Sequence, residues 1–182
     1  MSYEIDADKT FESIWRELSR STIDRRHEFR RLVLATSSNG DIRQRIVILR
    51  KVIKDVGFVF YTDTRSQKVK DIDIDNHVSV LAYSHKLKMQ LSCSGWVEKY
   101  EDASMNPSAW DLRSLKDYTT ILAPGAYIEL NEDVQYDHDR VHFTSYKINL
   151  NVIEYLQLSH ESHVRLQFKK KDDVWYTQRL VP

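Results

Sequence analysis

Cysteine is almost absent from the 182-residue sequence, which contains only Cys93. A single cysteine cannot form an internal disulfide, and this agrees with the reducing cytoplasm. No apolar run approaches the roughly 20 residues needed to cross a bilayer. The first fifteen residues are acidic and contain no apolar core of the kind found in a secretory signal. The sequence therefore predicts a cytoplasmic protein without a membrane segment.

Net charge is also absent, because 27 basic side chains balance 27 acidic ones. A neutral chain gives no electrostatic reason to expect binding to nucleic acid or to an anionic membrane. The basic stretch 25–31 is accordingly interpreted as a solvated helix end or turn. The composition, 41% hydrophobic and 30% charged, is that of a soluble globular protein, and the length suits one domain.

The hydrophobic pattern predicts a helical start followed by many strands. Asp8 or Thr10 can cap the first helix, whose apolar stripe has helical spacing: Phe11, Ile14, Trp15 and Leu18. An Asn-Gly turn at 38–41 predicts a β-hairpin. The expected strands are 32–36, 42–51, 58–61, 77–84, 87–97, 145–158, 163–169 and 174–180.

Two further helices and one long loop complete the prediction. A short helix is expected at 66–73, with Val69 and Ile72 facing inward, and a second at 101–116, where Pro107 starts or breaks it. Residues 131–142 are polar and predict a loop. The sequence thus predicts a mainly β fold with flanking helices, a closed or partly closed barrel in a single domain 1–182. Its helical segment is 1–31 and its barrel 32–182.

Three segments carry residue types that suit a planar ligand bearing a phosphate. The strand 45–50 begins with Arg45, whose guanidinium can grip a phosphate with two N–H groups. Ser66 and Lys68 stand at an expected helix start, where free N–H groups favour an anion. Gln90 carries an amide that can both donate to and accept from a heterocyclic ring. Glycine-rich phosphate motifs are missing, so these residues alone indicate only an anion site on a β-scaffold.

In these segments the sequence resembles the pyridoxamine 5'-phosphate oxidase family. The resemblance extends over residues 32–182. The matching segments have the order and separation found in the family: 45–50, 60–63, 66–68, 90–95 and 178–182. Residues 153–157 also resemble the family's strand that precedes its C-terminal motif. It implies a split β-barrel that binds flavin mononucleotide (FMN), in a homodimer with two flavins at the subunit interface. Such a flavoprotein takes its redox chemistry from the flavin.

The resemblance also implies a role for each matching residue. Arg45, Ser66 and Lys68 would hold the FMN phosphate, and Gln90 and Arg165 would reach the flavin from the partner subunit. The residues assigned to FMN are Arg45, Ile46, Val47, Ile48, Leu49, Arg50, Tyr61, Thr62, Ser66, Gln67, Lys68, Gln90 and Arg165.

Departures from the family pattern fall mainly on the substrate side. The family's Arg-Leu-His motif corresponds to 159–165, where its arginine is absent. Gln67 replaces an arginine of the phosphate cluster, although Arg65 is two residues away, and Leu156 replaces a tryptophan. The substrate-contacting residues expected here are Arg50, which stands where the family has a lysine, Arg113 and His163.

Four functions remain open at this point. The main expectation is an FMN-dependent oxidoreductase acting on a small molecule. The alternatives are an authentic pyridoxamine/pyridoxine 5'-phosphate oxidase of vitamin B6 metabolism, a non-catalytic module binding FMN or a B6 vitamer, and a barrel without cofactor. His138 and His142 lack a third ligand, so no metal is expected. Cys93 is expected to be a buried structural thiol.

Overall fold

The computed structural model describes residues 5–102, 107 and 110–182. Its helical elements are α1 (Ala7–Ile23), η1 (Glu28–Arg30), α2 (Gln67–Ile74), α3 (Leu112–Leu115) and η3 (Lys116–Tyr118). Its strands are β1 (Arg31–Ser38), β2 (Asp41–Ile48), β3 (Lys51–Ile53), β4 (Gly57–Asp63), β5 (His77–Ser84), β6 (Met89–Lys99), β7 (Phe143–Gln157), β8 (Val164–Lys171) and β9 (Val174–Leu180).

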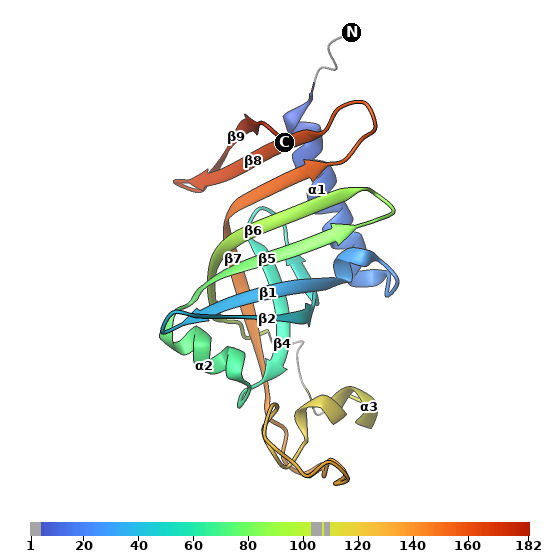
Figure 1. Ribbon diagram of the computed structural model, residues 1–182, viewed down its shortest axis with the longest axis vertical. Coiled ribbons are helices and arrows are strands. Elements are labelled where there is room, and N and C mark those ends of the chain that lie inside the picture. The colour runs from blue at the N-terminus through green and yellow to red at the C-terminus, as the bar shows by residue number, and fades with distance from the viewer. Residues whose placement is uncertain (1–4, 103–106, 108–109) are drawn as a thin grey trace.

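The strands form one antiparallel sheet that curls into a barrel. They pair in the order β2-β1-β5-β6-β7-β4-β3, and β8 and β9 extend the sheet from β7. The end strands β2 and β3 follow each other directly in the chain, and between them the Arg50 amide donates to the Val59 carbonyl of β4 at 2.9 Å, beside the β3–β4 pairing. Figure 1 shows α2 beside the lower part of the barrel and the β8–β9 hairpin at the top. The predicted mainly β fold with flanking helices is confirmed.

β7 is the long strand that serves both the barrel and the hairpin. Its first part pairs with β4 and its last part with β8, while β6 runs along almost all of it. A bulge interrupts β6 between Ser94 and Gly95. A Cβ atom on Gly95 would lie 1.9 Å from the Asn149 oxygen, and one on Gly57 would lie 1.8 Å from the Ile148 oxygen. Only glycine therefore permits this close approach on both sides of β7.

The helix α1 packs its apolar stripe against both the barrel and the hairpin. Ile14, Trp15 and Leu18 are buried, with the Trp15 ring 6.3 Å from Phe58. The Phe11 ring lies 4.9 Å from that of Phe168 on β8. The predicted caps, Asp8 and Thr10, are wrong: the helix begins at Ala7, and the Asp6 carboxylate accepts from the Lys9 amide at 2.9 Å. An N-cap precedes the first helical residue, and that place belongs to Asp6.

Two predicted elements differ in the structure. The expected strand 42–51 is split, because the chain leaves β1 after Ile48 and resumes pairing with β4 in β3. The expected helix 101–116 is wrong for most of its described residues, since only Leu112–Leu115 are α-helical. Residues 103–106 and 108–109 lie outside the described residues. Lys51 pairs with Asp102 at 2.6 Å, a tertiary contact that fixes the start of this segment without a helix.

Several local predictions are confirmed. Asn39 and Gly40 have φ angles of 52° and 88°, as a tight hairpin turn requires. Val69 and Ile72 of α2 are buried, and residues 131–142 form no strand or helix apart from one isolated bridge at Tyr136. Cys93 is buried in the barrel core, which raises the pKa of its thiol to about 12.

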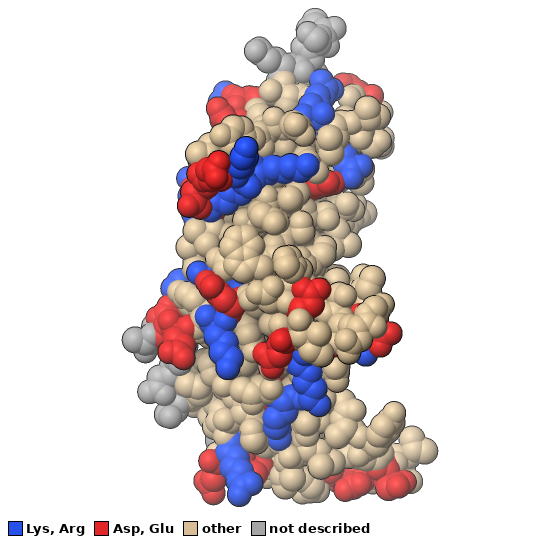
Figure 2. All heavy atoms as spheres, turned by 90° about the vertical axis from the view of Figure 1, so that its left-hand side faces the viewer, with Lys and Arg blue, Asp and Glu red and all other residues tan. Residues whose placement is uncertain are grey.

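Charged side chains of both signs are mixed on one face of the molecule. On the face shown in Figure 2, basic and acidic groups are interspersed, and uncharged atoms cover much of the middle. This distribution agrees with the balanced composition. Among the described residues, no helix has both the length and the apolar character that crossing a membrane demands.

Candidate functional site

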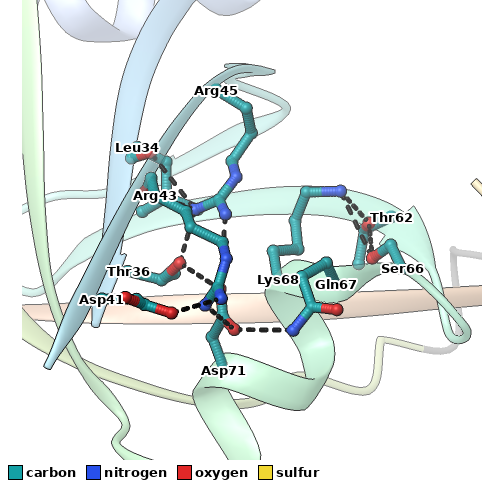
Figure 3. Close-up of polar contacts among 10 residues, drawn as sticks. All are labelled: Leu34, Thr36, Asp41, Arg43, Arg45, Thr62, Ser66, Gln67, Lys68 and Asp71. Atoms are coloured by element: carbon teal, nitrogen blue, oxygen red, sulfur yellow. Dashed lines mark hydrogen bonds and ion pairs between the residues drawn. The ribbon is translucent and has the colours of Figure 1, made fainter. Parts of the chain in front are cut away.

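A cluster of polar side chains lies where β4 runs into α2. Thr62 and Ser66 are buried, and their hydroxyl oxygens lie 3.1 Å apart. The Lys68 ammonium donates to Thr62 Oγ1 at 2.8 Å and to Ser66 Oγ at 3.3 Å (Figure 3). Both partners are uncharged. Burial, and after it the charge of Arg45, lowers the pKa of Lys68, and the opposing attraction of Asp63 is too weak to reverse this shift.

Ser66 occupies the N-cap position of α2, but its hydroxyl makes no capping hydrogen bond. It faces Thr62 and Lys68 instead. The side-chain hydroxyl is thus directed into the cluster, next to the helix N-terminus that attracts anions.

Arg45 reaches the same region from β2. Its guanidinium donates to Thr36 Oγ1 at 2.6 Å and pairs with Asp71 Oδ2 at 3.4 Å. Asp71 is fully buried on α2 and also accepts from Thr36 at 2.7 Å, from Gln67 at 3.0 Å and from Arg43 at 3.1 Å.

The carboxylate of Asp71 stays ionised in this setting. Burial alone would raise its pKa, but the hydrogen bonds from Gln67 and Thr36 and the charges of Arg43 and Arg45 together lower it. Asp71 therefore holds the two arginines in place. With Lys68 on the other side, the cluster has the donors and the charge that a phosphate group needs.

A pocket of about 360 Å³ lies beside Tyr61, the residue before Thr62 on β4. Arg50 lies over the Tyr61 ring, 5.1 Å from its centroid. Trp110 stacks on the same ring at 5.6 Å with an interplanar angle of 18°. The residues lining the pocket are Arg30, Arg50, Tyr61, Trp110, Ser114 and Asp117. Burial raises the pKa of Tyr61 in spite of the Arg50 charge, so Tyr61 acts here as a neutral aromatic wall.

Gln90 and Arg165 belong to a second group at the other end of the molecule. Gln90 is paired in register with Leu156 on β7, and Leu156 with Arg165 on β8. Arg165 pairs with Glu154 at 2.7 Å. His163 is exposed in the turn before β8, where its Nδ1 accepts from the Ser159 amide at 3.1 Å. Figure 1 places β8 far from α2, so one chain does not bring this group to Arg45 and Lys68.

The remaining predicted residues are spread around these groups. On β2, Val47 is buried with Leu49 just beyond it, whereas Ile46 is exposed and Ile48 partly so. Arg113 is exposed on α3, next to the pocket residue Ser114. Its expected role in contacting substrate, like that of His163, stays a prediction.

Arg65 does not take the place of Gln67 in the phosphate-type cluster. Its guanidinium pairs with Asp63 at 2.6 Å and donates to the carbonyl oxygens of Thr120 at 2.9 Å and Ile121 at 3.0 Å. It therefore anchors the start of the long segment 119–142 to the β4–α2 junction.

Four residues of these sites were not predicted from the sequence: Thr36, Arg43, Asp71 and Arg30. Arg43 could have been found, because it stands two residues before Arg45 and so lies on the same face of the strand. Asp71 could have been found with less certainty of pattern, because it follows Gln67 by four residues and so lies on the same face of the helix. Thr36 and Arg30 depend on the pairing of β1 and on the position of η1, which spacing does not reveal.

No group of three or more metal-binding side chains is found within residues 5–102, 107 and 110–182. His138, one of the two histidines considered for zinc, lies parallel to the Tyr136 ring at 6.3 Å.

An antiparallel barrel with a hairpin extension and a basic, hydroxyl-lined cluster at a strand-to-helix junction defines a split-barrel protein. The chain belongs to the pyridoxamine 5'-phosphate oxidase family, whose sequence profile matches residues 23–141. The pyridoxine/pyridoxamine 5'-phosphate oxidase of Vibrio atlanticus (strain LGP32) is 30% identical over 165 residues, which cover 82% of this chain and 78% of the relative. The enzyme of the same name from Vibrio cholerae (strain O395) is 30% identical over 166 residues, with the same coverage.

Solved structures of similar proteins share the fold. PhzG from Burkholderia lata 383, in complex with tetrahydrophenazine-1-carboxylic acid, superposes with a TM-score of 0.74 at 19% identity, covering 95% of this chain and 92% of that one. A pyridoxamine 5'-phosphate oxidase-related, FMN-binding protein from Nostoc punctiforme PCC 73102 has a TM-score of 0.72 at 20% identity, with coverage of 94% and 96%. At such identities the likeness establishes the split-barrel fold.

Proposed function

We propose that this protein is a homodimeric FMN-binding flavoprotein that oxidises or reduces a small molecule. The observation that carries the proposal is the positively charged cluster of Lys68 and Arg45, in which the Lys68 ammonium contacts only the uncharged hydroxyls of Thr62 and Ser66. A partly buried ammonium whose hydrogen-bond partners are uncharged is costly unless an anion joins it. The flavin named in the Nostoc punctiforme neighbour carries such an anion, its phosphate.

The residues present fit FMN at both ends of the ligand. Lys68, Ser66 and Arg45 supply charge and donors for the phosphate, and Tyr61 and Thr62 lie on the adjoining strand for the remainder of the molecule. FMN, when bound, supplies two-electron redox chemistry. The protein supplies position and positive charge.

The pocket beside Tyr61 suits a small, planar substrate with a negative group. Tyr61 and Trp110 provide its aromatic surface, and Arg50 and Arg30 provide positive charge. Arg50 lies over Tyr61, so its charge acts next to any ring that packs there. Arg113 lies next to Ser114 and is the residue we propose to contact substrate at the rim.

A homodimer would unite the two separated groups of site residues. The outer face of the barrel carries an apolar row across three strands, in which Val33 pairs with both Ile46 and Leu81. Ile46 is 63% exposed and Leu81 41% exposed. An exposed apolar row of this kind is typical of an interface. Gln90 faces the same side, so contact between two copies would carry Gln90 and Arg165 towards the partner's flavin.

Authentic oxidation of pyridoxamine 5'-phosphate is the second candidate. It is supported by the relatives at 27–30% identity that bear that name. The exposed turn at residues 159–163, with Glu161 and without an arginine, speaks against it. Oxygen-dependent formation of pyridoxal 5'-phosphate by the flavin-loaded protein would favour this candidate, whereas turnover of another small molecule alone would exclude it.

Titration with flavin tests the main proposal. Flavin-free protein should quench the fluorescence of added FMN with a saturable, one-per-chain stoichiometry, and should bind riboflavin more weakly because it lacks the phosphate. The bound flavin should then be reduced by a suitable substrate without air and reoxidised when air is admitted. Absence of saturable FMN binding would contradict the proposal. FMN binding without any turnover would contradict the proposed oxidoreductase activity and would indicate a module that only binds or carries FMN.

A further inference from the structure

Arg43 and Arg45 leave the same face of β2 and converge on one carboxylate. Arg43 lies 3.1 Å from Asp71 Oδ1, and Arg45 lies 3.4 Å from Asp71 Oδ2. Figure 3 shows both guanidinium groups above Asp71, on the side of α2 that also carries Lys68. Two groups bound to the same carboxylate are close neighbours, so an anion held by Arg45 also lies beside Arg43.

The cluster carries more positive charge than its buried carboxylate balances. Arg43, Arg45 and Lys68 are three cations, and the fully buried Asp71 is one anion. Asp41 also pairs with Arg43, at 2.9 Å, but it is 71% exposed, so water screens most of this interaction and Asp41 offsets only a small part of the Arg43 charge. Asp63 also attracts Lys68, but it is paired with Arg65 at 2.6 Å. Close to two positive charges therefore remain for a ligand, and a phosphate monoester carries about −1.5 to −2 near neutral pH. Without Arg43, only about one positive charge would remain to balance the phosphate.

We propose that Arg43 is a phosphate-binding residue of this site and that Asp71 is the positioning residue that presents Arg43 and Arg45 together. The proposal rests on the proposed binding of FMN and adds a third cation to it. Gln67 donates to the same Asp71 oxygen as Arg43, at 3.0 Å, but carries no charge. Arg43 supplies from β2 the positive charge that α2 does not provide at Gln67.

The test compares FMN with riboflavin, which has the same ring system and no phosphate. Dissociation constants are measured by fluorescence quenching on flavin-free protein. Arg43→Gln is expected to weaken FMN binding about tenfold or more, through loss of a charge-assisted contact, and to leave riboflavin unchanged. Arg16→Gln is the matched control, because Arg16 also lies beside a carboxylate, Glu17 at 3.8 Å, but on α1. It should change neither constant.

A second variant keeps the test decisive if Arg43→Gln fails to fold. Asp41→Asn removes only the exposed partner of Arg43 and should strengthen FMN binding about two- to fivefold, with riboflavin unchanged. Equal FMN affinity in Asp41→Asn and the original protein would overturn the role of Arg43, as would a loss in Arg43→Gln that is the same for both ligands. Failure of the original protein to bind FMN would instead contradict the proposed function itself.

Discussion

Lys68 and Lys70 lie two residues apart on α2 but in different surroundings. Lys68 donates to the hydroxyls of Thr62 and Ser66, whereas Lys70 is exposed. Lys68→Gln is expected to weaken FMN binding about tenfold or more, because a charge-assisted contact to the phosphate is lost. Lys70→Gln should leave it unchanged. Equilibrium titration checks this, and similar effects of the two substitutions would contradict a specific role for Lys68.

FMN affinity should also depend on alkaline pH. Burial, with the charge of Arg45, lowers the pKa of Lys68 below its ordinary 10.5, so the ammonium loses its proton at a lower pH than a free lysine does. The FMN phosphate is already a dianion above its second pKa of about 6. The dissociation constant should therefore rise as pH increases through the lowered pKa of Lys68. Titrations across this range check it, and Lys68→Gln should lack the dependence.

Sequence reasoning at the residue scale found the groups that depend on local spacing. Ser66 and Lys68 were identifiable because they begin a helix after a strand, and Arg45 because its guanidinium, on a nearby strand, can grip a phosphate with two N–H groups. Asp71 and Thr36 were not, because their meeting depends on α2 packing over β1. Local pattern thus identifies the members of the Lys68 cluster better than Asp71 and Thr36, whose place in it depends on tertiary packing.

At the scale of elements, the bulge in β6 depends on Gly95. A Cβ there would lie 1.9 Å from the Asn149 oxygen, an atom of the backbone. Gly95→Ala is expected to lower the free energy of unfolding by about 2–3 kcal/mol, because strands β6 and β7 must separate. Gly40→Ala meets no atom within 4 Å and should cost about 1 kcal/mol through its positive φ alone. Chemical denaturation measures both, and equal effects would contradict the packing argument.

Arg65 is expected to hold the segment 119–142 against the barrel. Its guanidinium donates to the carbonyl oxygens of Thr120 and Ile121. Arg65→Gln should speed amide hydrogen exchange about tenfold at Ile121 and Asp137, whose amides bond within this segment. Exchange in β5 and β6 should not change. Arg140→Gln, which removes an exposed pair with Asp137, is the control. Unchanged exchange in Arg65→Gln would show that the segment is held by other contacts.

Elements with strong local signals were predictable from the sequence. The hairpin around Asn39 and the helix α2 follow from turn chemistry and apolar spacing. The break after Ile48 and the irregular chain at 100–102 were not, because both result from contacts with distant strands. Arg50 bonds to Val59, and Tyr100 bonds to Ser145. Where local propensity is ambiguous, long-range strand pairing therefore decides where a strand begins and ends.

On the scale of the whole molecule, the outer barrel face should join two copies. Leu81→Glu places a charge in the apolar row with Val33 and Ile46. It is expected to shift the protein from dimer to monomer in light scattering and to weaken FMN binding, because Gln90 and Arg165 of the partner no longer reach the flavin. Ile23→Glu, on the exposed end of α1, is the control. A dimer that survives Leu81→Glu would place the interface elsewhere.

The visible absorption spectrum of the freshly purified protein, with the released chromophore then identified, tests the central claim most directly. FMN binding at the Arg45, Ser66 and Lys68 cluster predicts the two bands of an oxidised flavin and the release of FMN on denaturation, at about one per chain. A colourless protein that takes up no added FMN would contradict this assignment. The basic cluster would then serve another anion.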